Sequence, residues 1–122
     1  IFKMRSEIND ELVYEIRDDI LLGDLAADGG QLRPHIVWFE EAVPLIEPAA
    51  QMVKGADIFV VVGTSLLVYP AAGLIHYARL QIPKFILDKR IPYTPEIHNL
   101  VKIAKPATEG IVDLISVLNE QF

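Results

Sequence analysis

A continuous apolar run at residues 58–62, which ends abruptly in Gly63-Thr64-Ser65, constrains the fold more than any other feature. An apolar run of this length that is rich in β-branched residues predicts a strand buried on both faces. Residues 70–81 follow, with a proline at the start and apolar residues at helical spacing, and they predict a helix. Together the two segments favour a βα unit on a parallel sheet.

The rest of the chain extends this pattern. Strands are predicted at residues 83–87 and 101–104, and a short one at 35–39. Helices are predicted at 47–54 and 108–122, the second with Thr108 as a candidate cap. Strands that alternate with helices indicate an α/β fold, in which ligands bind at the carboxyl ends of the strands.

The N-terminal third is less regular. Residues 11–22 show an imperfect helical spacing, and 26–30 form a flexible, glycine-containing stretch. We expect residues 6–30 to be a surface excursion with little regular structure.

Composition excludes several classes of function. The 122 residues suggest one domain or part of one, and the chain lacks an initiator Met, as a piece of something longer would. A net charge of −6 argues against general nucleic-acid binding. The absence of cysteine excludes disulfides, thiolate metal sites and a cysteine nucleophile. No apolar run is long enough for a membrane span and no signal-peptide pattern is present, so we expect a soluble cytoplasmic protein.

The Gly63-Thr64-Ser65 turn is a candidate binding site. A glycine allows close approach of a ligand to the backbone, and the two hydroxyl groups can donate to phosphate or ribose oxygens. The same turn could equally be an ordinary exit from a strand followed by a helix cap. Neither of the common glycine-rich phosphate-binding motifs is present, so the turn alone does not decide between these readings.

Two longer segments give the chain a family resemblance. "LRPHIVWFEE" and "VVGTSLLVYPAAGL" resemble segments of the sirtuins, the NAD-dependent protein lysine deacylases, which carry motifs close to "LRPxVVWFGE" and "GTSxxVxPAA". The resemblance covers the whole chain as the C-terminal half of a sirtuin catalytic domain. It implies part of a Rossmann-like NAD-binding domain over residues 35–122. Residues 1–34 would be the connection and the remnant of a small, zinc-type subdomain.

The resemblance implies a set of cofactor contacts to NAD. They would come from the turn after the first buried strand, from the end of the next strand, and from the start of the last helix, and they are Gly63, Thr64, Ser65, Asp88, Lys89, Arg90 and Ala107. The family often has Asn where this chain has Asp88, whose carboxylate can accept hydrogen bonds from ribose hydroxyls. Ala107 would lie against adenine, or would be an ordinary loop alanine.

The resemblance also implies a substrate-binding segment formed by Val37, Trp38, Phe39, Glu40 and Glu41. Val37 would offer backbone groups to an acyl-lysine, Phe39 would line its tunnel, and the extended backbone beyond would pair with the substrate main chain. Trp38 could instead be a core residue. Glu40 stands where the family usually has Gly, which could alter the loop's dihedral angles.

Two family features lack their residues in this chain. The general-base histidine is expected upstream of Ile1, so no catalytic residue is assigned here, and His35, His76 and His98 do not match its position. Ser6 occupies the place of the first of the family's four zinc cysteines, and the stretch where the others would fall contains no sulfur. We therefore expect no bound zinc and a more flexible small subdomain.

The implied function is that of part of an NAD-dependent protein deacetylase or deacylase, which yields deacylated lysine, nicotinamide and O-acyl-ADP-ribose. The chain alone is expected to be inactive. The alternatives are a non-catalytic fragment that binds nucleotide or a partner, and an unrelated nucleotide-binding domain. An acyl-lysine protein or peptide is the expected partner. Because the predicted sheet has an open edge, we also expect self-association or pairing with an N-terminal half.

Overall fold

A computed structural model describes residues 2–121 of the chain. The chain divides into two compact units, Ile1–Ala42 and Val43–Phe122. That residues 1–34 are the remnant of a small subdomain and residues 35–122 are part of an NAD-binding domain remains a prediction.

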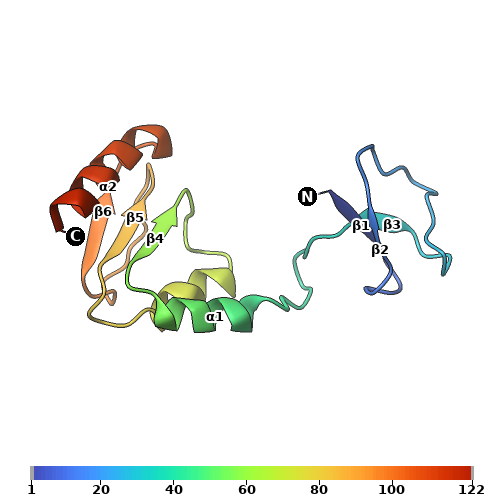
Figure 1. Ribbon diagram of the computed structural model, residues 1–122, viewed down its shortest axis with the longest axis horizontal. Coiled ribbons are helices and arrows are strands. Elements are labelled where there is room, and N and C mark those ends of the chain that lie inside the picture. The colour runs from blue at the N-terminus through green and yellow to red at the C-terminus, as the bar shows by residue number, and fades with distance from the viewer. Residues whose placement is uncertain (1, 122) are drawn as a thin grey trace. The chain divides into compact units, whose positions relative to one another are not determined.

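The first unit is built on a three-stranded antiparallel sheet (Figure 1). Its strands are β1 (Lys3–Ser6), β2 (Val13–Glu15) and β3 (Leu32–Pro34), in the order β2-β1-β3. The prediction of an irregular excursion over residues 6–30 is therefore wrong in part, since this stretch contains β2 and a bridge between Leu25 and Gln31.

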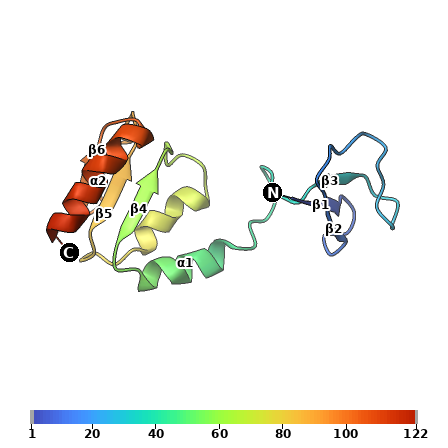
Figure 2. The same cartoon turned by 45° about the horizontal axis from the view of Figure 1, so that its top comes forward.

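The second unit is a three-stranded parallel sheet with flanking helices, as the sequence predicts. In chain order its elements are α1 (Ile46–Gly55), β4 (Phe59–Val62), the 3-10 helix η1 (Ala71–Tyr77), β5 (Lys84–Leu87), β6 (Leu100–Ile103) and α2 (Ala107–Gln121). The strand order is β4-β5-β6. The three strands lie side by side in every view (Figure 2).

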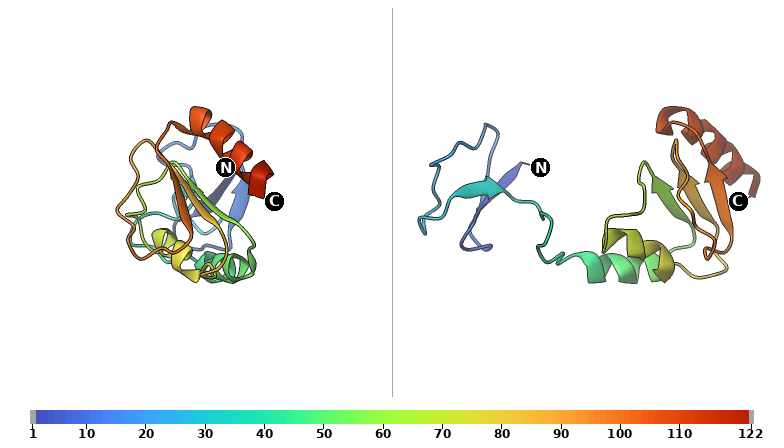
Figure 3. Two further views of the ribbon diagram at one scale, coloured as in Figure 1. Left: turned by 90° about the vertical axis from the view of Figure 1, so that its left-hand side faces the viewer. Right: turned by 180° about the vertical axis from the view of Figure 1, so that it is seen from behind.

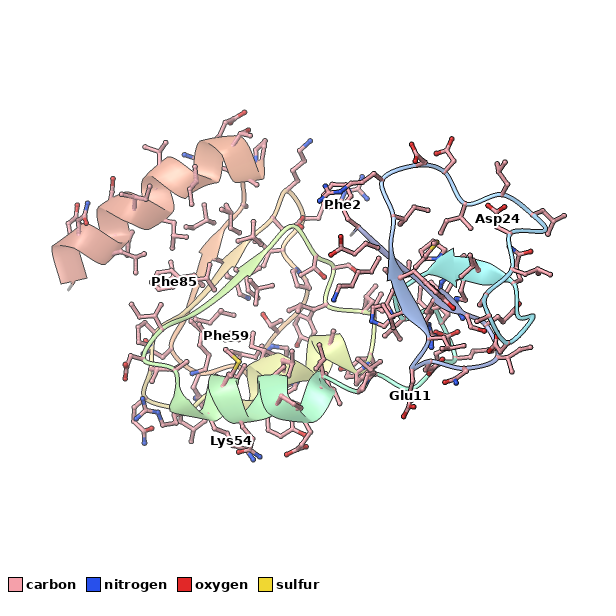
Figure 4. The ribbon with its side chains drawn as sticks, turned by 45° about the vertical axis from the view of Figure 1, so that its right-hand side comes forward. Phe2, Glu11, Asp24, Lys54, Phe59 and Phe85 are labelled. Atoms are coloured by element: carbon pink, nitrogen blue, oxygen red, sulfur yellow. The ribbon has the colours of Figure 1, made fainter. Side chains whose placement is uncertain are left out.

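Both faces of this sheet are packed. On one face Phe85 and Leu87 contact Leu114 of α2, while on the other Val61 and Ile86 contact η1. Views from two further sides show α2 apart from the pair formed by α1 and η1, with the sheet between them (Figure 3). Figure 4 labels Phe85 of β5 and Phe59 of the neighbouring strand β4. Phe85 packs with Leu114 of α2, and Phe59 packs against the cluster that contains Val53 of α1. Because β5 is buried along its whole length, its carboxyl end is held in a fixed place.

One predicted helix and one imperfect helical pattern differ from the structure. Instead of a helix over 70–81, the chain forms the shorter η1, because Ala78 turns to an extended conformation and packs with Ile82 against Val53 of α1. Residues 11–22 form no helix. Leu12, Tyr14 and Ile16 alternate with exposed residues at a period of two, which is the pattern of a strand.

Two local predictions are also wrong. Residues 35–39 form no strand: the pairing of β3 with β1 ends at Pro34, and Val37 is 44% exposed. Thr108 does not cap the last helix, since α2 begins one residue earlier at Ala107. Phe122, the predicted end of this helix, lies outside the described residues. No helix among residues 2–121 combines the length and apolar character that crossing a membrane requires.

Candidate functional site

The carboxyl edge of the parallel sheet is the first candidate site. The register aligns Val62, Leu87 and Ile103, the last residues of the three strands. The hydrogen-bond ladder continues one residue further, since the Gly63 N–H donates to the Leu87 carbonyl at 3.0 Å and the Asp88 N–H donates to the Ile103 carbonyl at 3.2 Å. Gly63 and Asp88 are thus fixed by the sheet at adjacent strand ends, where α/β folds bind ligands.

The turn after β4 has an unusual backbone. Gly63 has φ +65°, a left-handed conformation that favours glycine, and open space surrounds the position of an added Cβ. Leu66 is also left-handed at φ +55°, and its N–H donates to the Thr64 hydroxyl at 3.2 Å. The Leu66 side chain packs on the core cluster of Val61, Ile75 and Ile86. This anchor holds the turn in place while Ser65 stays exposed.

A second polar turn follows β5. One oxygen of the Asp88 carboxylate accepts the Arg90 N–H at 2.8 Å, which leaves its other oxygen available as an acceptor. Lys89 and Arg90 are exposed. A carboxylate beside two cationic residues suits a ligand that carries both hydroxyl groups and phosphates.

The third part of the edge is the start of α2. Ala107, an exposed residue, is the first of the helix. Two residues earlier, Lys105 pairs with Asp113 at 2.6 Å, and the Asp113 carboxylate raises the pKa of the Lys105 ammonium. The structure therefore brings the predicted cofactor residues of all three segments to one edge of the sheet. Their contacts with NAD remain predictions.

The predicted substrate segment, residues 37–41, belongs to the first unit and lies in a loop after β3. Trp38 and Phe39 are 55% and 84% exposed, so neither is a core residue. Glu40 has φ +70°. It therefore adopts a left-handed backbone conformation, which glycine adopts more easily than glutamate.

Glu41 is the one residue of this segment that is strongly bound to its surroundings. Its carboxylate accepts hydrogen bonds from the Arg33 guanidinium and from the Trp38 N–H at 2.9 Å. These hydrogen bonds, with weaker attraction from Arg5, lower the pKa of Glu41 to about 2. The carboxylate is therefore ionised at every physiological pH.

The residues at the family's zinc position do not fit that metal. Ser6 is fully buried, and its hydroxyl lies 2.8 and 2.9 Å from the two carboxylate oxygens of Asp28 while accepting the Ile8 and Asn9 N–H groups. Asp28 also accepts the Gly30 N–H, and these bonds hold its pKa below the usual range. Within residues 2–121 no group of three or more potential metal ligands comes together. A hydroxyl–carboxylate pair provides no closed tetrahedral shell for zinc.

The sequence left two important residues of these sites without a role. Leu66 is the apolar anchor of the Gly63 turn, and Arg33 binds Glu41 across the loop. The contact of Arg33 with Glu41 had one signal in the sequence. Arg33 stands a few residues before the acidic pair Glu40-Glu41. Nothing in the sequence pattern distinguishes Leu66 from its neighbours.

Comparisons with known proteins identify a family for this chain. A family model described as the Sir2 family matches residues 5–70. The chain is 43% identical over 117 residues to an NAD-dependent protein deacylase of Bacteroides thetaiotaomicron, covering 93% of this chain and 50% of the relative. It is 41% identical over 120 residues to one of Helicobacter pylori, covering 98% and 52%. The chain thus spans about half the length of the curated relatives it matches.

Solved structures give the same result for the fold. A Sir2 homologue in complex with NAD matches with a TM-score of 0.77 at 24% identity, over 98% of this chain and 48% of that one. A Sir2 structure in complex with an inhibitor, 2'-O-acetyl-ADP-ribose and a deacetylated peptide matches with a TM-score of 0.69 at 25% identity, over 97% and 52%. Because the family model matches more than half of the residues, the chain belongs to the Sir2 family.

Proposed function

We propose that this chain is the part of an NAD-dependent protein lysine deacylase that binds the adenosine end of NAD and the acyl-lysine peptide. The observation that carries the proposal is the left-handed Gly63 turn, held beside Asp88 at the carboxyl edge of the parallel sheet. Support comes from relatives named as deacylases and from a similar Sir2 structure that contains an acyl-ADP-ribose and a deacetylated peptide.

In this proposal the residues of the edge bind and orient the cofactor. The Ser65 hydroxyl and the backbone of the turn hold oxygens of NAD, the Asp88 carboxylate accepts hydrogen bonds from ribose hydroxyls, and Ala107 packs against adenine. NAD supplies the ribose that takes the acyl group as nicotinamide leaves. The substrate loop presents Phe39 to the acyl-lysine. The general base that activates a ribose hydroxyl is expected outside these residues.

The test is a binding measurement on the full-length protein. A Ser65→Ala substitution removes one hydrogen bond, and we expect it to weaken NAD binding by roughly two- to tenfold in calorimetry. Ser116→Ala, on the exposed face of α2, is the matched control and leaves the affinity unchanged. Equal NAD affinity of the Ser65→Ala variant and the wild type would remove the turn from the site.

A second measurement separates the deacylase from a non-catalytic binding protein. We expect the full-length protein to release nicotinamide from NAD in the presence of an acetylated or longer-chain acylated peptide, and the 122-residue chain alone to release none. NAD binding without nicotinamide release by the full-length protein would favour the non-catalytic alternative.

A further inference from the structure

The loop at residues 35–41 has few backbone contacts of its own. Apart from the His35 N–H, which donates to the Lys3 carbonyl of β1, its backbone bonds are local: Ile36 to Pro34 and Glu41 to Trp38. Six of its seven residues are exposed. The backbone alone therefore leaves this loop free to move, and the side chains that contact it determine its shape.

Arg33 of β3 contacts the loop at three places. Its two terminal nitrogens bind the two carboxylate oxygens of Glu41, one of them at 3.1 Å. One of these nitrogens also lies 3.4 Å from the Ile36 carbonyl. The guanidinium carbon is 5.2 Å from the centre of the Trp38 ring, within the range of a cation–π contact. Glu41 completes the arrangement by accepting the Trp38 N–H at 2.9 Å.

The neighbouring strand reinforces this arrangement. Arg5 of β1 stands directly opposite Arg33 in the antiparallel register, a placement at which like charges repel. Glu41 lies 3.5 Å from Arg5 as well, and Asp10 forms a second ion pair with Arg5. The Glu41 carboxylate thus pairs with two arginines of the sheet and connects the end of the loop to them.

We propose that Arg33 is a positioning residue, which through Glu41 and Trp38 holds the 35–41 loop in the shape that receives the acyl-lysine peptide. The inference rests on the proposed function for the identity of the ligand. A planar guanidinium that makes a bidentate bond is required, and a lysine ammonium cannot replace it. Without Arg33 the peptide must order the loop when it binds, and the exposed Phe39 is no longer held in place.

The first test is steady-state kinetics of the full-length deacylase. We expect Arg33→Met to lower kcat/KM for an acetylated peptide by about tenfold to a hundredfold, with the KM for NAD changed less than about twofold. Arg33→Lys gives a similar loss. In Arg33→Met/Glu41→Gln the loss equals that of Arg33→Met alone, because both residues act through one contact. Losses in kcat/KM that add in the double variant would overturn the proposal. A kcat/KM for the peptide within about twofold of wild type in Arg33→Met would overturn it as well.

The matched control is Arg17→Met in the same unit. Arg17 lies over the Phe2 ring at 4.2 Å and follows β2 by two residues. β2 and β3 are the two edge strands of the sheet, with β1 between them. We expect this variant to keep the wild-type peptide constants. A similar loss in Arg17→Met would show a general effect of unit stability and would also overturn the positioning role.

A second readout does not depend on turnover. Trp38 is the single tryptophan of the 122 residues, and subtraction of a Trp38→Phe variant isolates its emission. We expect faster nanosecond depolarisation of Trp38 in Arg33→Met than in wild type. If the wild-type protein deacylates no acyl-lysine peptide, the proposed function fails, and the Trp38 measurement decides the role of Arg33 by itself. Unchanged depolarisation contradicts that role.

Discussion

Glu40 shows how a single residue can carry strain at a candidate binding loop. Its φ of +70° lies in the region where a side chain other than glycine costs about 1–2 kcal/mol. Such strained positions cluster in ligand-binding segments. The loop holds this geometry with a glutamate at position 40, next to the contacts between Arg33 and Glu41.

Replacing Glu40 with glycine should relieve this strain. We expect Glu40→Gly to raise the free energy of unfolding by up to about 1 kcal/mol, because the greater entropy of glycine in the unfolded chain offsets only part of the gain. Urea unfolding followed by Trp38 fluorescence measures the change. Glu47→Gly, in the first turn of α1, should lower stability by about 1 kcal/mol and serves as the control. A Glu40→Gly variant less stable than wild type would contradict the strain.

The ion pairs of Glu41 predict a specific dependence on acid. The pKa of Glu41 is lowered from 4.5 to about 2 in the folded state, so the unfolded chain takes up this proton first as the pH falls. The stabilisation from Glu41 is complete above pH 4.5 and is lost between there and about pH 2. Urea unfolding at pH 6 should therefore show wild type more stable than Glu41→Gln, with the difference shrinking toward pH 2. A difference that grows on acidification would contradict this assignment.

At the scale of elements, α2 is seated closely on the sheet at Gly110. A Cβ added there would lie 2.1 Å from Leu87 Cδ1 and 3.0 Å from Ile103 Cγ2, and Leu87 is fully buried. The first turn of α2, with Ala107, thus approaches the sheet as closely as it does because no side chain intervenes.

This close approach predicts a cost for the smallest substitution. We expect Gly110→Ala to lower the free energy of unfolding by about 1–3 kcal/mol, despite the better helix propensity of alanine. Gly55→Ala, at the end of α1, has no atom within 4 Å of the added Cβ and should be neutral or stabilising by up to about 1 kcal/mol. Thermal unfolding compares the two variants. Equal effects would show that packing at Gly110 does not limit the approach of α2.

In the first unit a hydrogen bond joins two segments that are distant in the sequence. It connects the Ser6 hydroxyl, at the end of β1, with the Asp28 carboxylate, in the loop before β3. Removal of the hydroxyl in Ser6→Ala leaves the Ile8 and Asn9 amides without an acceptor, at a cost of about 1–3 kcal/mol. We expect faster hydrogen exchange of these two amides, with no effect of a zinc chelator on the wild-type rates. Slower exchange after addition of zinc to the wild type would contradict a metal-independent contact.

The sequence predicts the second unit better than the first for a physical reason. β5 is a short apolar run buried along its whole length, and α2 packs Leu114 on it, so local pattern and final burial agree there. The prediction that residues 58–62 are buried on both faces is wrong, because β4 is an edge strand whose Val60 and Val62 are exposed. The position of the candidate nucleotide edge follows from that topology. β2 was missed, and its stretch expected to be irregular, because the strand has only three residues. The Ser6–Asp28 contact joins residues far apart in the sequence, which no local pattern shows.

At the scale of the whole molecule, the second unit exposes an apolar surface. Val60 and Val62 of the edge strand β4 are 37% and 48% exposed, and the register places them beside Phe85 and Leu87 on the face that α2 covers. α2 also exposes three apolar residues: Ile111, Val112 and Ile115. We expect the half of the curated relatives' length that this chain does not span to supply the cover for this surface.

This surface predicts the solution behaviour of the 122-residue chain. We expect the chain to self-associate, or to bind the remaining half when the two are mixed, and Val60→Lys/Val62→Lys to weaken both associations. Leu80→Lys, a substitution at an exposed apolar residue after η1, is the control. Light scattering coupled to size-exclusion chromatography measures the mass. A monodisperse 13.6 kDa monomer that does not bind the remaining half would contradict the expectation.

The ladder that continues past β4 and β5 into Gly63 and Asp88 has a consequence for the thermodynamics of recognition. Because both residues are held next to a fully buried central strand, their conformational entropy is already lost when the protein folds. Under the proposed function, a dinucleotide that binds at this edge would meet groups already fixed in position, and little ordering of the protein would oppose its binding.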